Sequence, residues 1–329
     1  FMHDVIDEFF DIIEQKGINV KQITDEEIKQ IVDEIVEQKL QLKQNYIFTS
    51  IPKYRVLAVR LKKVILKSMR YIVDSLKYSK FEVLAHELEF KNGKEYEPIV
   101  FELDNNKKIE ITGKIDRIDI AKTSDGNYIR IIDYKSSIKD INLNEVVAGL
   151  QLQLLTYLDA VCDINDFLPA GVLYFNLIDQ SVKANSRISD EQIEAEIKKQ
   201  FKMKGLILAD VEVAKMMDTN LESGSSNIIP AYVDKEGNLS SKSNAVTRKQ
   251  FESLQKYTKK IIKQISREIL SGNIDIKPYY KVKGGKTPCD YCSYKTICNF
   301  NSGICKNSYY YIGNINKEAI LEEISKEDK

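Results

Sequence analysis

Hydrophobic residues recur at helical spacing near the start of the chain, at Val5, Ile6, Phe9, Ile12 and Ile13. This spacing predicts an amphipathic helix with one buried face. Residues 24–27, Thr-Asp-Glu-Glu, form a capping box, which predicts that a second helix begins there. Pro52 predicts the start of a third helix, because a proline at the first helical position loses no hydrogen bond.

From residue 81 the pattern changes to short runs of β-branched and aromatic residues, which favour strands. We predict strands over residues 81–90, 99–103, 109–120, 128–134 and 170–177. One long helix is expected over 143–161, and further helices over 186–217, 247–270 and 317–325. Residues 218–246 are rich in Ser, Asn and Gly and are expected to form a long, poorly ordered surface excursion. These elements predict an α/β core with helices appended to a central sheet.

Two of the strand-forming runs carry acidic residues close to one another in the predicted fold. Residues 113–119 contain Asp116, residues 131–135 contain Asp133 and Lys135, and an Asp125-Gly126 step in the link favours a hairpin. In such a hairpin Asp116 and Asp133 lie side by side. Because side chains alternate along a strand, Asp133 and Lys135 point to the same face. Asp119, three residues after Asp116, faces away and is expected to pair with Arg117 or a neighbour.

Two carboxylates and an ammonium group at one point are suited to phosphodiester chemistry. Mg²⁺ takes one or two protein carboxylates and completes its shell with water and substrate phosphate. A lysine beside that water can orient it or stabilise charge on a phosphate oxygen. The alternative for the same residues is a solvated charge pair on an exposed strand face, which contributes little to stability.

These motifs resemble the RecB-type branch of the PD-(D/E)xK nucleases. The resemblance rests on Gly-x-Ile-Asp at 113–116, Ile-Asp-Tyr-Lys-Ser at 132–136 and Gln-Leu-x-x-Tyr at 153–157. The opening Phe-Met-His-Asp-Val-Ile at 1–6 and the cysteine segment at 289–298 also match, so that the motifs span nearly the whole chain. Within this branch the chain is most similar to the AddB family of bacterial helicase–nuclease proteins.

The resemblance implies a role for each motif residue. His3, Asp116 and Asp133 would hold Mg²⁺ with help from the backbone carbonyl of Tyr134, and Lys135 would position the attacking water. Gln153 and Tyr157, which are four residues apart and share a helix face, would contact DNA or steady Lys135. Read without the family, the same two residues are a polar pair on a helix that packs on the sheet. His86 has no motif around it and is interpreted as structural.

Three cysteines, Cys289, Cys292 and Cys298, form a C-x₂-C-x₅-C pattern. Zinc is the usual ligand of a C-x₂-C pair, but the resemblance implies a 4Fe–4S cluster, which takes four thiolates. In that family the fourth cysteine lies just before the first motif, a region that would precede Phe1 in a longer protein. Cys305 is the other candidate, and Cys162 is expected to be a small buried hydrophobe.

The family resemblance also implies a division of the chain and a restriction-endonuclease-like fold, with a mixed central sheet flanked by helices. Residues 1–80 would form a helical segment carrying the first motif, and 81–205 the nuclease core. Residues 206–280 would form a helical extension with a polar surface loop, and 281–329 the cysteine strap and tail. The implied activity is a DNA exonuclease that leaves 5′ phosphates, works with an AddA-type helicase–nuclease partner, and serves double-strand-break repair.

Composition restricts the setting of this activity. The chain has 49 basic and 49 acidic residues, so that DNA contact has to come from local patches. One such candidate is the region from Pro52 to Lys80, with nine Lys or Arg and one acid, and a second is the basic helix at 248–267. No apolar run is long enough to span a membrane and no signal peptide opens the chain, and the few cysteines favour the cytoplasm.

Two further hypotheses remain open at this level. One is a catalytically silent DNA-binding module of the same fold. The other is a stand-alone nuclease of the CRISPR-adaptation kind, which shares the motifs and the cysteine segment. The intact Asp116, Asp133 and Lys135 argue against the first, and the helical insert between His3 and Asp116 argues against the second.

Overall fold

The structure is a computed structural model that describes residues 1–42, 46–94, 96–179, 189–304 and 308–327. Contacts divide the chain into two compact units. The first comprises Phe1–Pro98, Thr112–Asp140 and Ala160–Arg248, and the second comprises Ile99–Ile111, Ile141–Asp159 and Lys249–Lys329. The four-part division expected from the sequence remains a prediction.

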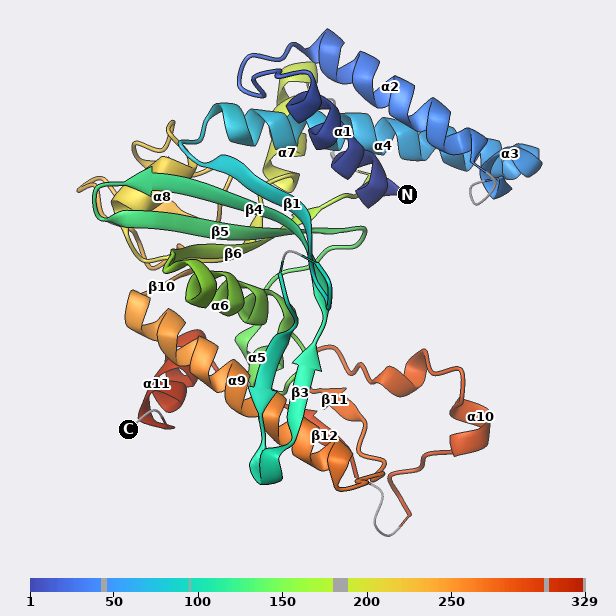
Figure 1. Ribbon diagram of the computed structural model, residues 1–329, viewed down its shortest axis with the longest axis vertical. Coiled ribbons are helices and arrows are strands. Elements are labelled where there is room, and N and C mark those ends of the chain that lie inside the picture. Colours follow the sequence, from blue (N-terminus) through green and yellow to red (C-terminus); the bar gives the residue numbers. More distant parts are fainter. Residues whose placement is uncertain (43–45, 95, 180–188, 305–307, 328–329) are drawn as a thin grey trace. The chain divides into compact units, whose positions relative to one another are not determined.

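A six-stranded sheet with the order β1-β4-β5-β6-β7-β10 organises the first unit (Figure 1). Its strands are β1 (Glu82–Phe90), β4 (Gly113–Thr123), β5 (Gly126–Lys135), β6 (Leu168–Asn176), β7 (Lys204–Leu208) and β10 (Ala245–Val246). The β5–β6 and β7–β10 pairs are parallel and the other three pairs are antiparallel. The predicted mixed α/β sheet is therefore confirmed.

Three long helices pack together beside β1 on one face of this sheet (Figure 1). They are α1 (Met2–Gln15), α2 (Asp25–Gln41) and α4 (Pro52–Lys77), and the short α3 (Ile47–Ser50) precedes α4. The predicted capping box at Thr24 and the predicted proline start at Pro52 are both present. Apolar residues such as Phe9, Ile35 and Ile72 are at most 1% exposed, so that the helical stripes read from the sequence form the core.

The hairpin between β4 and β5 has the predicted antiparallel form. Thr123 pairs with Gly126 across a turn whose two central residues are Ser124 and Asp125. Gly126 has φ +132°, a conformation that residues with a side chain rarely adopt. A Cβ atom there would also lie 2.9 Å from Leu168 Cδ1. The glycine thus allows β5 to begin immediately after the turn.

A buried ion group ties β4 to β5 behind the hairpin. Asp119, which is fully buried, accepts a hydrogen bond of 3.1 Å from Arg117 Nη2 and one of 2.9 Å from Arg130 Nε. Arg117 Nη1 also donates to the Tyr134 hydroxyl at 2.9 Å, and the Arg130 guanidinium lies 4.8 Å from the centre of the Phe81 ring. Asp119 faces away from Asp116 and pairs with Arg117, as predicted.

The region after β6 differs from the expectation. Residues 186–217 are not helical throughout, since β7 lies between α7 (Asp190–Gln200) and α8 (Val211–Met217), and residues 186–188 lie outside the described part. Gly205 interrupts the helical pattern and lets β7 approach β6, because a Cβ there would collide with the Val172 carbonyl oxygen. In the sequence β7 is a single short apolar run, and hydrophobic periodicity cannot distinguish a strand from a piece of helix in so short a run.

Residues 218–246 are also folded against the sheet rather than forming a surface excursion. They contain β8 (Gly224–Ser225) and β9 (Tyr232–Val233), and β10 extends the six-stranded sheet. Ile229 and Val233 are fully buried. A turn joins β9 to the residues that follow it, with Gly237 N–H donating to the Asp234 carbonyl. The polar composition of the segment therefore concealed the few apolar side chains that it buries.

The second unit contains the elements β2 (Ile99–Glu102), β3 (Lys108–Ile111), α5 (Leu143–Val147), α9 (Arg248–Leu270), β11 (Tyr279–Lys281), β12 (Tyr310–Ile312) and α11 (Lys317–Glu327). Short helices η2 (Asp104–Asn106), η3 (Pro288–Asp290) and α10 (Lys295–Cys298) complete it. The helix α6 (Gln153–Asn165) has its first seven residues in this unit and the rest in the first. Among the described residues, no helix is long and apolar enough to cross a membrane.

Two expected elements are each broken in two. The strand expected over 109–120 is β3 and β4, because β3 pairs with β2 whereas β4 pairs with β1 and β5. The long helix expected over 143–161 is α5 and α6. Leu150 N–H bonds to the Glu145 carbonyl and Gly149 N–H to the Val146 carbonyl, which is a Schellman stop with Gly149 at φ +77°.

Replacing Asp119 with Ala should destabilise the fold strongly, because it leaves the two buried guanidinium groups of Arg117 and Arg130 without their carboxylate. We expect a loss of about 3–5 kcal/mol in the free energy of unfolding, measured by urea denaturation. The matched control is Glu196→Ala, which removes an exposed ion pair with Lys199 and should cost less than about 1 kcal/mol. Equal losses in the two variants would contradict a structural role for the buried group.

Candidate metal centre

Asp116 and Asp133 lie opposite each other on neighbouring strands. The pairing of Arg117 with Ile132 in the antiparallel ladder places Asp116 across from Asp133. Asp116 Oδ2 accepts a hydrogen bond of 2.7 Å from the backbone N–H of Tyr134, which orients the carboxylate. The structure therefore brings together the two acids that the sequence predicted as ligands, while the role of the Tyr134 carbonyl stays a prediction.

His3 reaches the same group from the first turn of α1. Its Nδ1 lies 3.4 Å from Asp116 Oδ2. The hydrogen bond to Asp116 raises the pKa of His3, and burial opposes that rise. The packing of α1 beside β1 thus places the imidazole of the predicted first motif next to the acid of the predicted second.

Lys135 and Asp133 share a face at the end of β5, as the alternation of side chains predicts. Lys135 Nζ lies 2.6 Å from Asp133 Oδ2 and 5.9 Å from the centre of the Tyr174 ring. Burial raises the pKa of Asp133 to about 6, and the nearby Asp116 carboxylate adds to that rise while Lys135 opposes it. Asp133 is thus a buried acid beside a second carboxylate, and the ammonium group of Lys135 stabilises its charged form.

Glu87 is a residue of this group that the sequence analysis did not identify. It lies on β1 between two residues that pair with β4, so that it faces Asp116. Its φ of +48° is uncommon for a residue with a side chain and marks local strain of the kind found at functional sites. Burial raises its pKa, and Lys114 Nζ forms an ion pair with it. A β-strand glutamate in a run of alternating polar residues carried no signal that could single it out.

The donor set suits a divalent cation. Ligand atoms of His3, Glu87 and Asp116 lie within 4.8 Å of one another, and Asp133 is across the strand pair from Asp116. Carboxylate oxygens are ligands of Mg²⁺ and Mn²⁺, and the imidazole nitrogen is tolerated better by Mn²⁺ than by Mg²⁺. A cation bound here would neutralise carboxylates that the protein keeps close together and partly buried.

The remaining predicted site residues belong to the second unit. Gln153 Nε2 donates to the Tyr157 hydroxyl at 3.4 Å, so that the two share a helix face as expected. Cys289 is half-buried and Cys292 and Cys298 are exposed, all with free thiols. Within the described residues these three cysteines do not form a compact group of ligand atoms, and Cys305 lies outside those residues.

His86 is an ion-paired residue that links β1 to α1. Its Nδ1 lies 2.7 Å from Asp7 Oδ1 and its Nε2 lies 3.7 Å from Asp11 Oδ1. The two acids are one turn apart on α1 and so present their carboxylates to the same neighbour. This contact helps to hold α1, and with it His3, beside the sheet.

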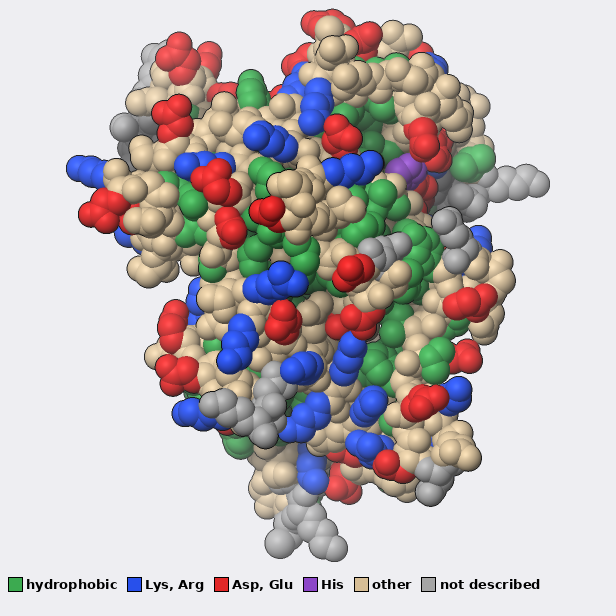
Figure 2. Space-filling view, turned by 60° about the vertical axis from the view of Figure 1, so that its left-hand side comes forward, with side chains coloured by type: hydrophobic (Ala, Val, Ile, Leu, Met, Phe, Trp, Pro, Cys, Tyr) green, Lys and Arg blue, Asp and Glu red, His purple; other side chains and the backbone are tan. Residues whose placement is uncertain are grey.

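Many cations of the predicted basic regions are paired with acids. In α4, Arg60 lies 2.8 Å from Asp179, and Lys62 lies 3.0 Å from Asp33. In the second unit, Lys259 of α9 lies 2.8 Å from Asp159. The space-filling view likewise shows Lys and Arg mixed with Asp and Glu over the face in view (Figure 2). Other cations of α4, such as Lys63 and Lys67, have no carboxylate within 4.0 Å among the described residues, so that DNA contact by these helices stays a prediction.

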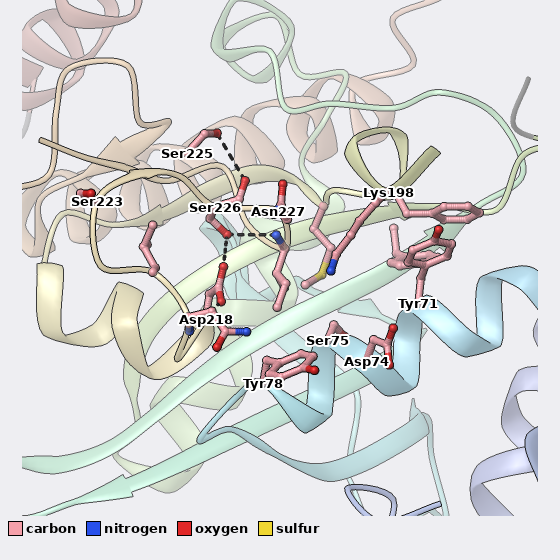
Figure 3. Close-up of a pocket in the computed structure, with 16 residues that line it drawn as sticks. Tyr71, Asp74, Ser75, Tyr78, Lys198, Asp218, Ser223, Ser225, Ser226 and Asn227 are labelled. Carbon is pink, nitrogen blue, oxygen red and sulfur yellow. Dashed lines mark hydrogen bonds between the residues drawn. The ribbon is translucent and has the colours of Figure 1, made fainter. Parts of the chain in front are cut away.

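A separate cavity of about 90 Å³ lies away from the predicted residues (Figure 3). Tyr71 of α4 and Tyr78, which directly follows α4, line one side, and the segment around Ser226 lines the other. Ser226 Oγ donates to Asp218 Oδ2 at 2.6 Å and accepts from the Ile228 N–H, which holds this segment in place. None of the predicted site residues lines this cavity.

Comparison with known proteins places these features in a family. A sequence profile of the PD-(D/E)XK nuclease superfamily matches residues 1–299. A protein of Acetivibrio thermocellus, named as the B subunit of an ATP-dependent helicase/deoxyribonuclease, is 40% identical over 335 residues, which is 100% of this chain and 29% of that protein. A protein of the same name from Clostridium novyi is 40% identical over 333 residues, 99% of this chain and 29% of that protein. The chain thus spans less than a third of the length of these relatives.

Divalent metal should bind this group through carboxylates of β1, β4 and β5. Asp116→Asn should weaken Mn²⁺ binding at least about tenfold, measured by electron paramagnetic resonance of free Mn²⁺. Glu87→Gln should weaken it as well, whereas Lys135→Ala should leave it largely intact. Asp125→Asn, in the exposed hairpin turn, is the matched control. Wild-type affinity in the Asp116 variant would show that the site lies elsewhere.

Proposed function

The chain belongs to the PD-(D/E)XK nuclease superfamily, and from this premise we propose that it is a metal-dependent deoxyribonuclease domain that trims DNA ends for recombinational repair. The observation that carries the proposal is the meeting of His3, Asp116, Asp133 and Lys135 at one end of the β4–β5 pair. The name of the relatives supports DNA as the substrate and a helicase–nuclease complex as the setting. That name also favours one component of a complex over a stand-alone nuclease.

The residues divide the work of phosphodiester hydrolysis. His3, Asp116 and Asp133 would hold Mg²⁺ or Mn²⁺, with Glu87 as a further carboxylate. When bound, the cation would polarise the phosphate and lower the pKa of a coordinated water. Lys135, at the edge of the group, would orient the attacking water and stabilise the charge that develops on a phosphate oxygen. Bond formation from water to phosphorus and release of the 3′ oxygen would leave a 5′ phosphate.

We also propose a partner, a compartment and a cluster. The partner is a helicase–nuclease protein of the AddA type, because the name of the relatives describes one of several components of a helicase/deoxyribonuclease. The compartment is the cytoplasm, where free thiols such as those of Cys292 and Cys298 persist. The cluster is a 4Fe–4S centre on Cys289, which is half-buried, and on Cys292 and Cys298, which are exposed. Its fourth thiolate would come from outside the described residues.

Lys135→Ala should abolish cleavage while the protein still binds metal and DNA. A loss of about 10²–10³-fold or more in the rate of single-strand cleavage is expected, because one charge-stabilising donor is removed from the transition state. The matched control is Lys122→Ala, an exposed lysine near the turn at the other end of the hairpin, which should cleave at the wild-type rate. Wild-type cleavage by Lys135→Ala would contradict the site assignment.

The cluster should appear in a protein that has the full length of these relatives. Cys292→Ser should remove the iron and the brownish absorbance and lower the melting temperature, because metal–thiolate bonds contribute to folding. Cys162→Ser is the matched control, since Cys162 is a buried residue of α6 outside the cysteine segment and should leave the iron content unchanged. Cys305→Ser separates the two candidates for the fourth ligand. Full iron content in Cys292→Ser would exclude the proposed ligands.

A further inference from the structure

A pocket rich in lysine lies in the first unit, apart from the metal centre. It has a volume of about 420 Å³ and is lined by Lys199, Lys202, Lys204, Lys242, Tyr232 and Asp140, among others. We call this group the lysine pocket. Its lining carries four ammonium groups and one carboxylate, in a chain whose formal net charge is zero. Such a local excess of positive charge attracts anions more strongly than the whole chain does.

Three of these lysines have no acidic partner in the described part of the chain. No carboxylate oxygen among the described residues lies within 4.0 Å of Lys202, Lys204 or Lys242. Lys202 Nζ instead donates to Ser225 Oγ at 3.0 Å, and Lys242 Nζ lies 4.8 Å from the centre of the Tyr232 ring. Burial lowers the pKa of Lys202, and the more distant carboxylate of Asp218 opposes that shift only in part.

The sheet connects the lysine pocket to the metal centre. Asp133 of β5 is opposite Tyr174 of β6, and Tyr174 is opposite Lys204 of β7. Residues directly opposite in a sheet share a face, and neighbouring strands are about 4.8 Å apart, so that the Cα of Lys204 is about 10 Å from that of Asp133. Tyr174 lies between them and contacts Lys135 through its ring.

The chain leaving β5 runs from the metal centre to the pocket. Asn176 of β6 accepts a hydrogen bond from the Lys139 N–H at 2.8 Å, and its own side-chain amide donates to the Lys139 carbonyl at 3.2 Å. Asp140, the next residue, lines the pocket. Asn176 is itself opposite Lys135 in the β5–β6 pairing. The segment that leads from the metal centre to the pocket is therefore fixed to the end of β6.

We propose that the lysine pocket binds the phosphates of the DNA strand that extends from the reacting phosphodiester, with Tyr232 against a base or sugar. The inference rests on the proposed nuclease function, since it names the path of that substrate. A strand fits better than a small anion, because Lys204 lies at the same end of the sheet as the metal centre, and the other lysines of the pocket extend the positive charge beyond it. An aromatic side chain among cations is typical of surfaces that bind single strands without sequence preference.

The first experiment measures the binding of a twelve-residue oligothymidylate without divalent metal, in a Lys135→Ala background that does not cut it. Replacing Lys202, Lys204 and Lys242 with Gln should weaken binding about tenfold or more. It should also reduce the slope of log affinity against log salt by about 2, since each lost phosphate contact contributes about 0.7. The matched control replaces three exposed lysines of the same unit, Lys16, Lys29 and Lys122, with Gln. Equal affinity and slope in both triple variants would overturn the proposal.

A second measurement leaves the pocket intact and so does not depend on the folding of the triple variant. An oligonucleotide with photoreactive 5-bromouracil should cross-link to Tyr232 or its neighbours in Lys135→Ala protein, as mapped by mass spectrometry. Cross-links confined to other parts of the chain would overturn the proposal. Competition by inorganic triphosphate at equal phosphate concentration and with equal strength would replace the strand with a small-anion site.

A cleavage assay with Mg²⁺ or Mn²⁺, on proteins that keep Lys135, separates failure of the pocket from failure of the proposed function. Pocket-dependent binding in the Lys135→Ala background, with no cleavage by the wild-type protein, would retain the strand path and reject the nuclease. Unchanged binding by the triple variant in that background, with cleavage by the wild-type protein, would retain the nuclease and reject the strand path. Thermal unfolding of each variant confirms that the folded proteins are compared.

Discussion

The antiparallel register of β4 and β5 is the constraint on which the candidate site depends. A slip of one residue would carry Asp116 to the opposite face of the sheet and away from Asp133. The register is held at one end by Gly126, which fits where a larger residue would meet Leu168, and behind the strands by the buried group around Asp119. Because this group forms only when both strands are in place, it couples the geometry of the site to the stability of the sheet.

Around this strand pair the fold places several carboxylates close together, although repulsion between like charges opposes that arrangement. Asp116 raises the pKa of both Asp133 and Glu87 in addition to the effect of burial, and Glu87 holds a strained backbone conformation opposite Asp116. The packing of the helices beside β1 holds this arrangement together. His86 of β1 forms ion pairs with two acids of α1 and so keeps His3 in place. This crowding of partly buried carboxylates is the observation on which the proposed cation site rests, because a bound cation would favour their charged forms.

The sequence predicted the parts of this architecture that depend on near neighbours. The hairpin, the shared face of Asp133 and Lys135 and the caps of α2 and α4 all follow from spacing of a few residues, and the superfamily resemblance is confirmed. The break between β3 and β4 was missed because alternation does not change when a strand changes partners. Glu87 and the lysine pocket were missed for a related reason: each joins residues that only the sheet brings together.

In a chain whose formal net charge is zero, the pairing of cations with acids decides which Lys and Arg side chains remain available to bind phosphate. In α4, acids from other parts of the chain pair with Arg60 and Lys62, whereas Lys63 and Lys67 have no carboxylate within 4.0 Å among the described residues. In the lysine pocket, Lys202 and Lys204 are close together in the sequence, and the fold of the segment after α8 brings Lys242 to them. No carboxylate of the described residues lies within 4.0 Å of Lys202, Lys204 or Lys242, and Lys202 donates to Ser225 Oγ instead. The number of cations in a stretch of sequence therefore does not show by itself which of them can bind phosphate, because the folded neighbours decide which cations pair with acids.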